Sequence, residues 1–501
     1  MTPPCLIPAI RPQLSLRTGS RIIARTHHLK HHLRRNFSQS LSHRLRVSEL
    51  PNDHLNTLKA NPDRLWSSIH QTAQWGPGRR YGDLPEQAGL SRLSLSDADQ
   101  QARKWFKETA ESLDCVVSTD AMGNQFAVRK GLDASKAPVF AGSHLDTQPS
   151  GGRFDGVLGV CAGIEMLEVL KENWIETEGA VGVVNWTNEE GARFPLSMMG
   201  SGVWAGEFPQ EKVYAMREIG KGGKTVEEEL RRIGALGEVP CSWEKGMKLG
   251  GHFELHIEQG PHLVTSGEKV GVVKGAQAYR WYSVTLTGRD SHSGTTSFKH
   301  RADALLMAAK LILKVQAIAE QEGGLASVGI IEALPGSVNT VPGTVKMTLD
   351  IRHHQDQVLE EMERRIHDYL PGIWYESKSR GGPGVKAKME RFFESKAVRF
   401  DYKAIQCVEA AANGILGRKP RQLGSKLRDA APKMISGAGH DSVFTSKRCP
   451  TAMIFAPCRD GVSHHPEEWC EKEDCATGAS VLIGSVLRFD QERFKTHGVD
   501  D

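Results

Sequence analysis

The sequence predicts an α/β protein whose mainly parallel sheet is interrupted by a smaller α+β unit. Two observations indicate this class. Between residues 138 and 190 an apolar strand, a helix and a second apolar strand follow one another, which is typical of a parallel layer. Residues 280–395 instead follow the order strand, helix, strand, strand, helix, strand, which is that of a ferredoxin-like module.

The first pattern begins with "APVFAGSHLDT", an apolar strand that runs into a loop. The stretch "GVLGVCAGIEMLEVLKEN" is typical of a helix, with apolar residues in i, i+3, i+4 register at Val160, Ile164, Leu167 and Leu170. "GAVGVVNWTNEE" follows as a second strand. Residues 55–114, before this unit, have a helical pattern with a break at "WGPGRRYGDLPEQAG".

The second pattern comprises the strands "RWYSVTLTG", "LASVGIIEAL", "TVKMTLDIR" and "GVKAKMERF" and the helices "RADALLMAAKLILKVQAIAEQ" and "QDQVLEEMERRIHDYL". We expect the first helix to bury one face, formed by Leu305, Ala308, Ile312, Val315 and Ala319. From "KAIQCVEAAANGIL" onward the pattern of the first segment, typical of a parallel α/β layer, returns. The predicted domains are therefore 50–277 and 395–492 for the two parts of the large domain, and 278–394 for the insertion.

The N-terminus differs from the rest of the chain in charge. Before Glu49 the chain has no acidic residue, but it has eight arginines and Lys30. This composition predicts a mitochondrial transit peptide over residues 1–37, with Ser38 as the first mature residue after "RRNF". Its removal takes away seven basic residues and changes the formal net charge from +4 to −3, so charge gives no argument for nucleic acid. The alternative is a basic tail on a cytosolic protein.

Cysteine usage and hydropathy exclude several classes. The nine cysteines include no CxxC pair, which argues against a disulfide framework or a thiolate zinc site and is typical of a reducing compartment. No uninterrupted apolar stretch approaches the ~18 residues of a membrane-spanning helix. We therefore expect no association with membranes.

Histidines and carboxylates recur where apolar strands give way to Gly- or Ser-rich loops. A single histidine at such a place is more often a packed or surface residue, but the repetition predicts a metal site on a rigid sheet. Imidazole and carboxylate ligands without thiolates suit zinc, or else manganese, cobalt or nickel. The candidates are His144, Asp146, Asp155, Glu189, Glu190, His252, His256, Glu258, His440, Asp441, His464, His465 and Glu467.

In these motifs the chain resembles a known family. The series "GSHLDT", "GGRFDG", "NEEGARF", "HIEQG" and "SHHPEE" is similar to the hydantoinase/carbamoylase group of dinuclear-metal amidohydrolases, within the aminoacylase-like metallopeptidase clan. That group includes β-ureidopropionase, N-carbamoyl-L-amino-acid hydrolase and allantoate amidohydrolase. The resemblance extends from about residue 60 to residue 490 and implies a metallopeptidase-like catalytic domain.

The resemblance also implies a set of ligands for two divalent metals, zinc above all. His144 and His256 would hold one metal, Glu190 and His464 the other, and Asp155 would bridge them. Glu189, next to a ligand, would then be the general base that takes a proton from the attacking water.

Further residues are implied to contact the substrate. His292 of "GRDSHSGTT" would polarise the scissile carbonyl, and Asn339 and Arg352 would bind a carboxylate, for which a guanidinium is well suited. Gln259 would contact the ureido group, with His440 in the same pocket. Asn339 could instead be a turn residue and Arg352 an ordinary strand charge. In this family the inserted domain acts as a lid and joins two subunits, which implies a homodimer.

The implied reaction is hydrolysis of an N-carbamoyl amino acid to amino acid, carbon dioxide and ammonia, so the partner is a small molecule with a carboxylate and a ureido group. Allantoate amidohydrolase is an alternative with the same metals and base. A dipeptidase or aminoacylase is disfavoured because His256 stands where peptidase relatives usually have an acidic residue. A catalytically inactive dimeric scaffold would have no need of Glu189 and the ligands.

Overall fold

The computed structural model describes residues 44–220, 222–379, 382–418 and 430–495. The predicted transit peptide, 1–37, lies outside these residues. None of the helices in the described ranges combines the length and the apolar character that crossing a bilayer requires.

A nine-stranded mixed sheet forms the centre of the large unit, with β18-β10-β20-β9-β6-β8-β5-β4 in order and β19 paired to β10. Its middle strands β20, β9, β6 and β8 are mutually parallel. This confirms the predicted α/β class with a mostly parallel sheet. The strands are β4 (Cys115–Thr119), β5 (Gln125–Arg129), β6 (Val139–His144), β8 (Val181–Trp186), β9 (Gly251–Ile257), β10 (Gly271–Ala276), β18 (Val398–Arg399), β19 (Lys433–Ser436) and β20 (Thr451–Ala456).

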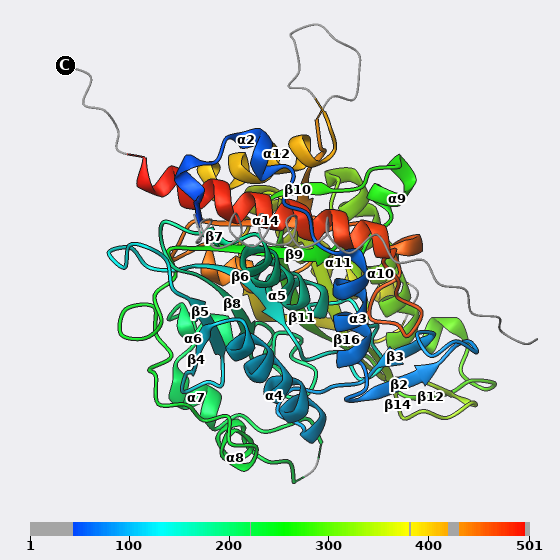
Figure 1. Ribbon diagram of the computed structural model, residues 1–501. Helices are drawn as coiled ribbons and strands as arrows, with labels where there is room; N and C mark the ends of the chain where they lie inside the picture. The colour runs from blue at the N-terminus through cyan, green and yellow to red at the C-terminus, as the bar shows by residue number, and fades with distance from the viewer. Residues whose placement is uncertain (1–43, 221, 380–381, 419–429, 496–501) are drawn as a thin grey trace, which may run out of the picture. The chain divides into compact units, whose positions relative to one another are not determined.

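Helices cover this sheet, and α14 (Lys472–Phe494) crosses it beside α5 (Val157–Glu172), as Figure 1 shows. Almost every residue of α5 is buried, because the helix packs on β6 and β8 on one side and on α14 and α3 (Pro62–Thr72) on the other. Two more helices, α4 (Asp97–Ser112) and α12 (Tyr402–Ile415), complete the cover. Side-chain caps fix their starts, since Ser96 and Asp401 accept from backbone N–H groups of the first turns.

Shorter elements connect these layers. The predicted break in the N-terminal helical segment forms a hairpin of β2 (Pro77–Arg80) and β3 (Ala88–Leu90). A second apolar cluster surrounds Trp186 and Trp204, on the side of the sheet where the small helices lie. The remaining short elements of the large unit are β1 (Leu45–Arg46), η1 (Val47–Glu49), α2 (Asn52–Leu55), β7 (Ile175–Glu176), α6 (Met199–Trp204), α7 (Gln210–Tyr214), α8 (Val226–Arg232), α9 (His262–Ser266), α13 (Asp441–Thr445) and η3 (Arg459–Gly461).

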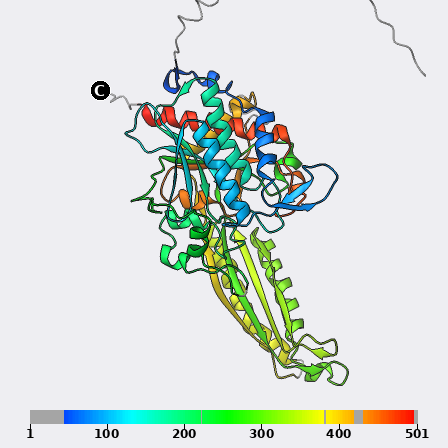
Figure 2. The same ribbon diagram turned by 60° about the horizontal axis from the view of Figure 1, so that its bottom comes forward.

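The inserted segment has its own antiparallel sheet, in the order β13-β16-β11-β17 with β14 paired to β16. Two long helices pack along it (Figure 2). The other sheet face carries the aromatic side chains of Tyr279, Trp281 and Phe393. The elements are β11 (Ala278–Thr287), α10 (Ala304–Glu322), β13 (Leu325–Ser327), β14 (Ile331–Leu334), β16 (Thr344–His353), α11 (Asp356–Ser379) and β17 (Lys386–Ser395).

Three details of this segment differ from the prediction. Ala308, Val315 and Ala319 of the predicted face of α10 are buried, but Leu305 is 39% exposed, and Met307, Leu311 and Ile318 belong to the buried face as well. The predicted strand "LASVGIIEAL" divides into β13 and β14, whose pairings with β16 differ in register by one residue, and between them the Thr348 hydroxyl accepts from the N–H of Ile330. Helix α11 continues past Pro371, and Ile373 beyond the proline belongs to its buried face.

Candidate metal centre and catalytic pocket

Parallel strands deliver the first candidate ligands to one edge of the central sheet. Strand β6 ends at His144, and the adjacent β9 ends just after His256. On the other side of β6, β8 ends at Trp186, and the loop that follows carries Glu189 and Glu190. Because these strands run in the same direction, their polar residues converge where ligands of α/β sheets collect.

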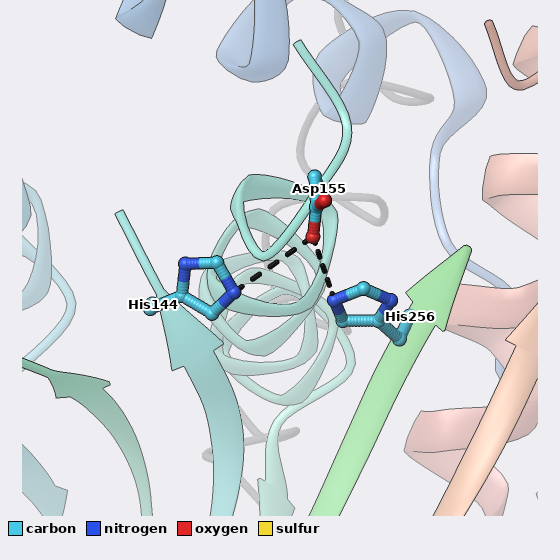
Figure 3. Close-up of side chains that lie close together, drawn as sticks. All are labelled: His144, Asp155 and His256. Atoms are coloured by element: carbon cyan, nitrogen blue, oxygen red, sulfur yellow. Dashed lines mark ion pairs between the residues drawn. The ribbon is translucent and has the colours of Figure 1, made fainter. Parts of the chain in front are cut away.

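Asp155 lies at the centre of the cluster. One of its oxygens, Oδ1, is 3.0 Å from Nε2 of His256 and 3.9 Å from Nε2 of His144. Figure 3 shows both imidazole rings directed at this carboxylate from neighbouring strands. The other oxygen, Oδ2, is 3.3 Å from Nε2 of His464, and that nitrogen is 3.6 Å from Glu190. Each carboxylate oxygen thus faces a separate group of candidate ligands.

The histidines at the strand ends have the tautomer that a metal requires. Nδ1 of His144 lies 2.9 Å from the carbonyl oxygen of Asp146, and Nδ1 of His256 lies 2.9 Å from that of Ile257. A carbonyl can only accept, so Nδ1 carries the proton and Nε2 is left as the donor atom for a cation. Both Nε2 atoms are buried, and both face the Asp155 carboxylate, at 3.0 Å from His256 and 3.9 Å from His144. These nitrogens and the neighbouring carboxylates therefore fit divalent cations.

Charge around these histidines favours a bound cation. Burial lowers the pKa of His144 to about 4. Burial acts in the same direction on His256, but the hydrogen bond and charge of Asp155 outweigh it and raise the pKa of His256 to about 9. Asp155 thus stabilises positive charge at this point, and a cation can take the place of the proton.

The adjacent carboxylates of Glu189 and Glu190 are held by a rigid turn. Asn188 begins it with a left-handed backbone (φ 56°), which asparagine tolerates better than most residues. Its side-chain amide donates to the carbonyls of Phe194 and Leu196 at 3.1 and 3.0 Å. The Asp146 carboxylate accepts from the N–H groups of Glu189 and Glu190, both at 3.3 Å, and so also holds the turn.

Glu189 is 7% exposed, and its Oε2 is 3.5 Å from Nε2 of His144. Burial and the charges of Asp441 and Glu190 raise its pKa well above the ordinary value, so the carboxylate has a high affinity for a proton. Burial, followed by the charge of Asp155, also raises the pKa of Glu190, to about 8. A proton acceptor beside a cation site is the arrangement that activation of a water requires.

Two residues hold Asp155 in place. Glu468 is buried, and its Oε1 accepts from the N–H groups of Phe154 and Asp155, both at 3.0 Å. Its Oε2 accepts from the Ser463 hydroxyl at 2.9 Å, next to His464. Gln259, by contrast, donates through Nε2 to Asp155 Oδ2 at 2.9 Å. Glu468 therefore joins the two loops that carry Asp155 and His464.

A cavity of about 240 Å³ opens beside this cluster. Asp155, Glu189, Glu190, His256, His464, Gln259 and His440 line it from the large unit, and Tyr279, Trp281 and Arg352 line it from the inserted sheet. A larger hollow of about 760 Å³ adjoins it and shares Gln259, Arg352 and His464. The smaller cavity is the one that contains the candidate base, and we regard it as the site of the chemistry.

His440 and Arg352 are both fixed by neighbours. Ring nitrogen Nε2 of His440 is 2.9 Å from the Ser436 hydroxyl, and its ring packs edge-on against that of His256, with centroids 4.5 Å apart. The Arg352 guanidinium lies 5.0 Å from the centre of the Tyr279 ring and pairs with Asp350 at 2.7 Å.

His292 and Asn339 do not line either hollow. His292 belongs to the short strand β12 (Ser291–His292), which pairs with β15 (Thr340–Val341), and the carbonyl of Asn339 accepts from Ser293 at 2.9 Å. The structure thus brings these two residues close to each other on the inserted segment, but not to the cavity of the same chain. Their roles remain predictions.

Sequence reasoning missed several residues of the site. Asp146 was a candidate ligand but supports the turn instead, and Glu468, rather than the exposed Glu467, faces the cluster. Glu254 accepts from the hydroxyls of Ser143 and Ser442 beneath the histidines, both at 2.6 Å. The alternation of "HFELHIEQG" could have revealed Glu254, because it shares a strand face with His256. No pattern indicated Tyr279 or Trp281.

A mostly parallel sheet whose strand ends gather histidines and carboxylates around Asp155, next to the buried Glu189, is typical of hydrolases that use bound metal ions. Residues 140–488 match the model of peptidase family M20/M25/M40. The chain belongs to this family, and within it to the hydantoinase/carbamoylase group, which confirms the resemblance seen in the motifs. Members of the family typically bind divalent metals.

Relatives of known name cover nearly the whole chain. An N-carbamoyl-L-amino-acid amidohydrolase of Rhizobium meliloti is 38% identical over 431 residues, 86% of this chain and 96% of the relative. An allantoate amidohydrolase of Bacillus subtilis is 30% identical over 413 residues, 82% and 94% of the two chains. The crystal structure of a hydantoinase/carbamoylase family amidase from Burkholderia multivorans is 39% identical, with a TM-score of 0.76 over 86% of this chain and 98% of that one.

Proposed function

We propose that this chain hydrolyses the carbamoyl C–N bond of N-carbamoyl amino acids, releasing the amino acid, carbon dioxide and ammonia. The observation that carries the proposal is the 240 Å³ cavity, in which Glu189 and the ligand cluster lie at one wall and Arg352 at another. A substrate with a ureido group at one end and a carboxylate at the other matches both walls. The amidohydrolase names of the relatives agree with this chemistry.

Two divalent cations would be held by the cluster, His144 and His256 for one, Glu190 and His464 for the other, with Asp155 between them. We infer zinc from the nitrogen and oxygen donors and the lack of a thiolate among them. When bound, such cations lower the pKa of a water and polarise the scissile carbonyl.

The residues of the chain perform the proton transfers. Glu189 takes a proton from the attacking water and passes it to the leaving amine, for which its buried position 3.5 Å from Nε2 of His144 suits it. Arg352 orients the substrate through its carboxylate. Gln259 and His440 line the wall next to the ureido group.

Ammonia release from a panel of substrates tests the proposal. The panel contains N-carbamoyl-β-alanine, N-carbamoyl-L-methionine, allantoate and a dipeptide whose hydrolysis is followed separately. We expect turnover of at least one N-carbamoyl amino acid. Exclusive turnover of N-carbamoyl-β-alanine would define a β-ureidopropionase, and exclusive turnover of allantoate would contradict the proposal in favour of the alternative.

We further propose a homodimer. His292 accepts from the N–H groups of Gly294 and Thr295 at Nδ1, so Nε2 carries the proton and can donate to a carbonyl. Because neither His292 nor Asn339 lines the cavity of its own chain, a second copy could supply them. Exposed apolar side chains on the inserted segment, Leu313, Ile330 and Ile331, offer a surface for that contact.

Complementation tests this arrangement. His292→Ala and Glu189→Gln should each be inactive alone, and co-expression should restore part of the activity, since one site of the mixed dimer would have both groups. Light scattering measures the molar mass of the wild-type protein in solution and so distinguishes a dimer from a monomer. A monomer, or the absence of complementation in a proven mixed dimer, would contradict the proposal.

We also propose import into mitochondria with cleavage of residues 1–37, from the acid-free, arginine-rich N-terminus. N-terminal sequencing of the endogenous protein should begin near Ser38. An intact Met1 terminus on protein isolated from cytosol would contradict it.

A further inference from the structure

Tyr279 contributes a polar atom that none of the roles above uses. Its side chain is 4% exposed and lines the 240 Å³ cavity together with Glu189 and Arg352. A Cβ on Gly439, another lining residue, would lie 3.2 Å from the Tyr279 hydroxyl oxygen, so the hydroxyl reaches the wall of the large unit. We find no hydrogen bond from this hydroxyl to any residue that the structure describes. A ligand in the cavity is therefore its available partner.

Packing fixes the position of this phenol. Its ring stacks on that of Phe393, with centroids 5.4 Å apart and an angle of 25° between the planes, and it contacts Trp281 at 5.5 Å. Tyr279 and Arg352 are direct partners across β11 and β16, and the guanidinium lies over the ring at 5.0 Å. The hydroxyl and the guanidinium thus belong to the same patch of the inserted sheet.

Arg352 alone has few donors left for a substrate. A guanidinium has five N–H groups. Nε and Nη2 donate to Asp350, at 3.1 and 2.7 Å, and Nη1 donates to the carbonyl of Gly437 at 2.8 Å. At most two N–H groups remain, whereas a carboxylate offers about four acceptor positions. A second donor in the same patch would satisfy a carboxylate that Arg352 leaves partly unpaired.

We propose that the Tyr279 hydroxyl donates a hydrogen bond to the carboxylate of the substrate beside Arg352, and that this contact helps to select substrates that bear a carboxylate. This inference rests on the proposed function for the identity of the substrate. Tyr279 is then a substrate-binding and specificity residue, with its effect on KM rather than kcat, because the carboxylate takes no part in bond cleavage.

The test compares Tyr279→Phe with the wild type and with Tyr282→Phe. Tyr282 lies on the same strand but is buried in the core on the opposite, helix-covered face of the sheet, so its variant is a matched control. With N-carbamoyl-β-alanine, or the panel compound that the wild type hydrolyses fastest, we expect Tyr279→Phe to raise KM about tenfold with kcat nearly unchanged. Tyr282→Phe should leave KM unchanged.

Titration calorimetry measures how much the substrate's carboxylate contributes to the contact with Tyr279. In a Glu189→Gln background, whose turnover is expected to be about 10²–10⁴-fold slower, adding Tyr279→Phe should weaken the binding of N-carbamoyl-β-alanine about tenfold. The binding of N-ethylurea, the same molecule without its carboxylate, should stay unchanged. An unchanged KM, a loss confined to kcat, or equal weakening of both ligands would overturn the inference. Failure of the proposed function would be seen separately, as a wild-type enzyme that hydrolyses no N-carbamoyl compound.

Discussion

The two sheets of the molecule gather their polar residues in different ways. In the central sheet, candidate ligands separated by more than 300 positions, such as His144 and His464, lie around the single carboxylate of Asp155. In the inserted sheet, Arg352 faces the cavity, whereas His292 and Asn339 lie on a separate short ladder and line neither hollow. Parallel buried strands force their ends together, but antiparallel strands distribute such residues along both ends of the sheet. The candidate ligands of the central cluster therefore lie together in one chain, whereas His292 and Asn339 line neither of the hollows that Arg352 lines.

The largest expected effect tests whether the central cluster is a metal site. Removal of metal with a chelator should abolish turnover, because without a cation no water is acidified enough to attack at neutral pH. Added zinc, manganese or cobalt should restore activity. Circular dichroism serves as the control that the fold persists. Full turnover by protein that elemental analysis shows to be metal-free would refute the metal site.

The next prediction distinguishes the roles of two adjacent residues, Glu189 as the base and Glu190 as a metal ligand. Glu189→Gln keeps all five candidate ligands, so metal content should be unchanged while kcat falls about 10²–10⁴-fold, the usual worth of a general base. Glu190→Gln replaces a charged ligand with a neutral one, so one metal should bind weakly and excess metal should restore part of the activity. Metal analysis and steady-state kinetics on both variants decide the roles. Equal metal depletion in both, or a Glu189→Gln enzyme that retains most of its kcat, would show the assignment to be wrong.

The same contrast explains which parts of the site could be predicted from sequence. Apolar runs that end in histidine or glutamate mark the ends of buried strands, and for β6, β8 and β9 this was enough to place His144, Glu189 and His256 at one edge of a sheet. The class of fold followed from the same runs. Resemblance supplied the roles, and neither source could say that His292 would lie outside the cavity, since that depends on how a whole sheet is placed.

Supporting residues were harder to predict for a physical reason. Glu468 and Asp146 act by accepting from backbone N–H groups of loops distant in sequence, and such pairings leave no periodic signal. In the sequence, Tyr279 is one more residue of an alternating strand. It lines the cavity only because of where that strand lies in the fold. Even the buried face of α10 was misjudged at Leu305, because every apolar residue in an apolar helix is a candidate for burial.

The smallest expected effect concerns the support of the cluster rather than its ligands. Glu468→Ala removes the acceptor of the Phe154 and Asp155 N–H groups and of the Ser463 hydroxyl. Asp155 and His464 then lose the connection between their loops, and metal affinity should fall about 10–100-fold, as is usual for residues that orient ligands.

Cobalt titration followed by absorbance measures this affinity independently of turnover, and Glu467→Ala is the matched control, since Glu467 is exposed and its side chain does not reach the cluster. Saturation with cobalt should return most of the kcat of Glu468→Ala, because Glu189 and all five ligands remain. If Glu468→Ala binds cobalt as tightly as Glu467→Ala, the two loops are held by other contacts and Glu468 does not position Asp155. If activity stays low at saturating cobalt, the ligands are in place but misdirected, and the effect of Glu468 lies in the geometry of the bound site rather than in its affinity.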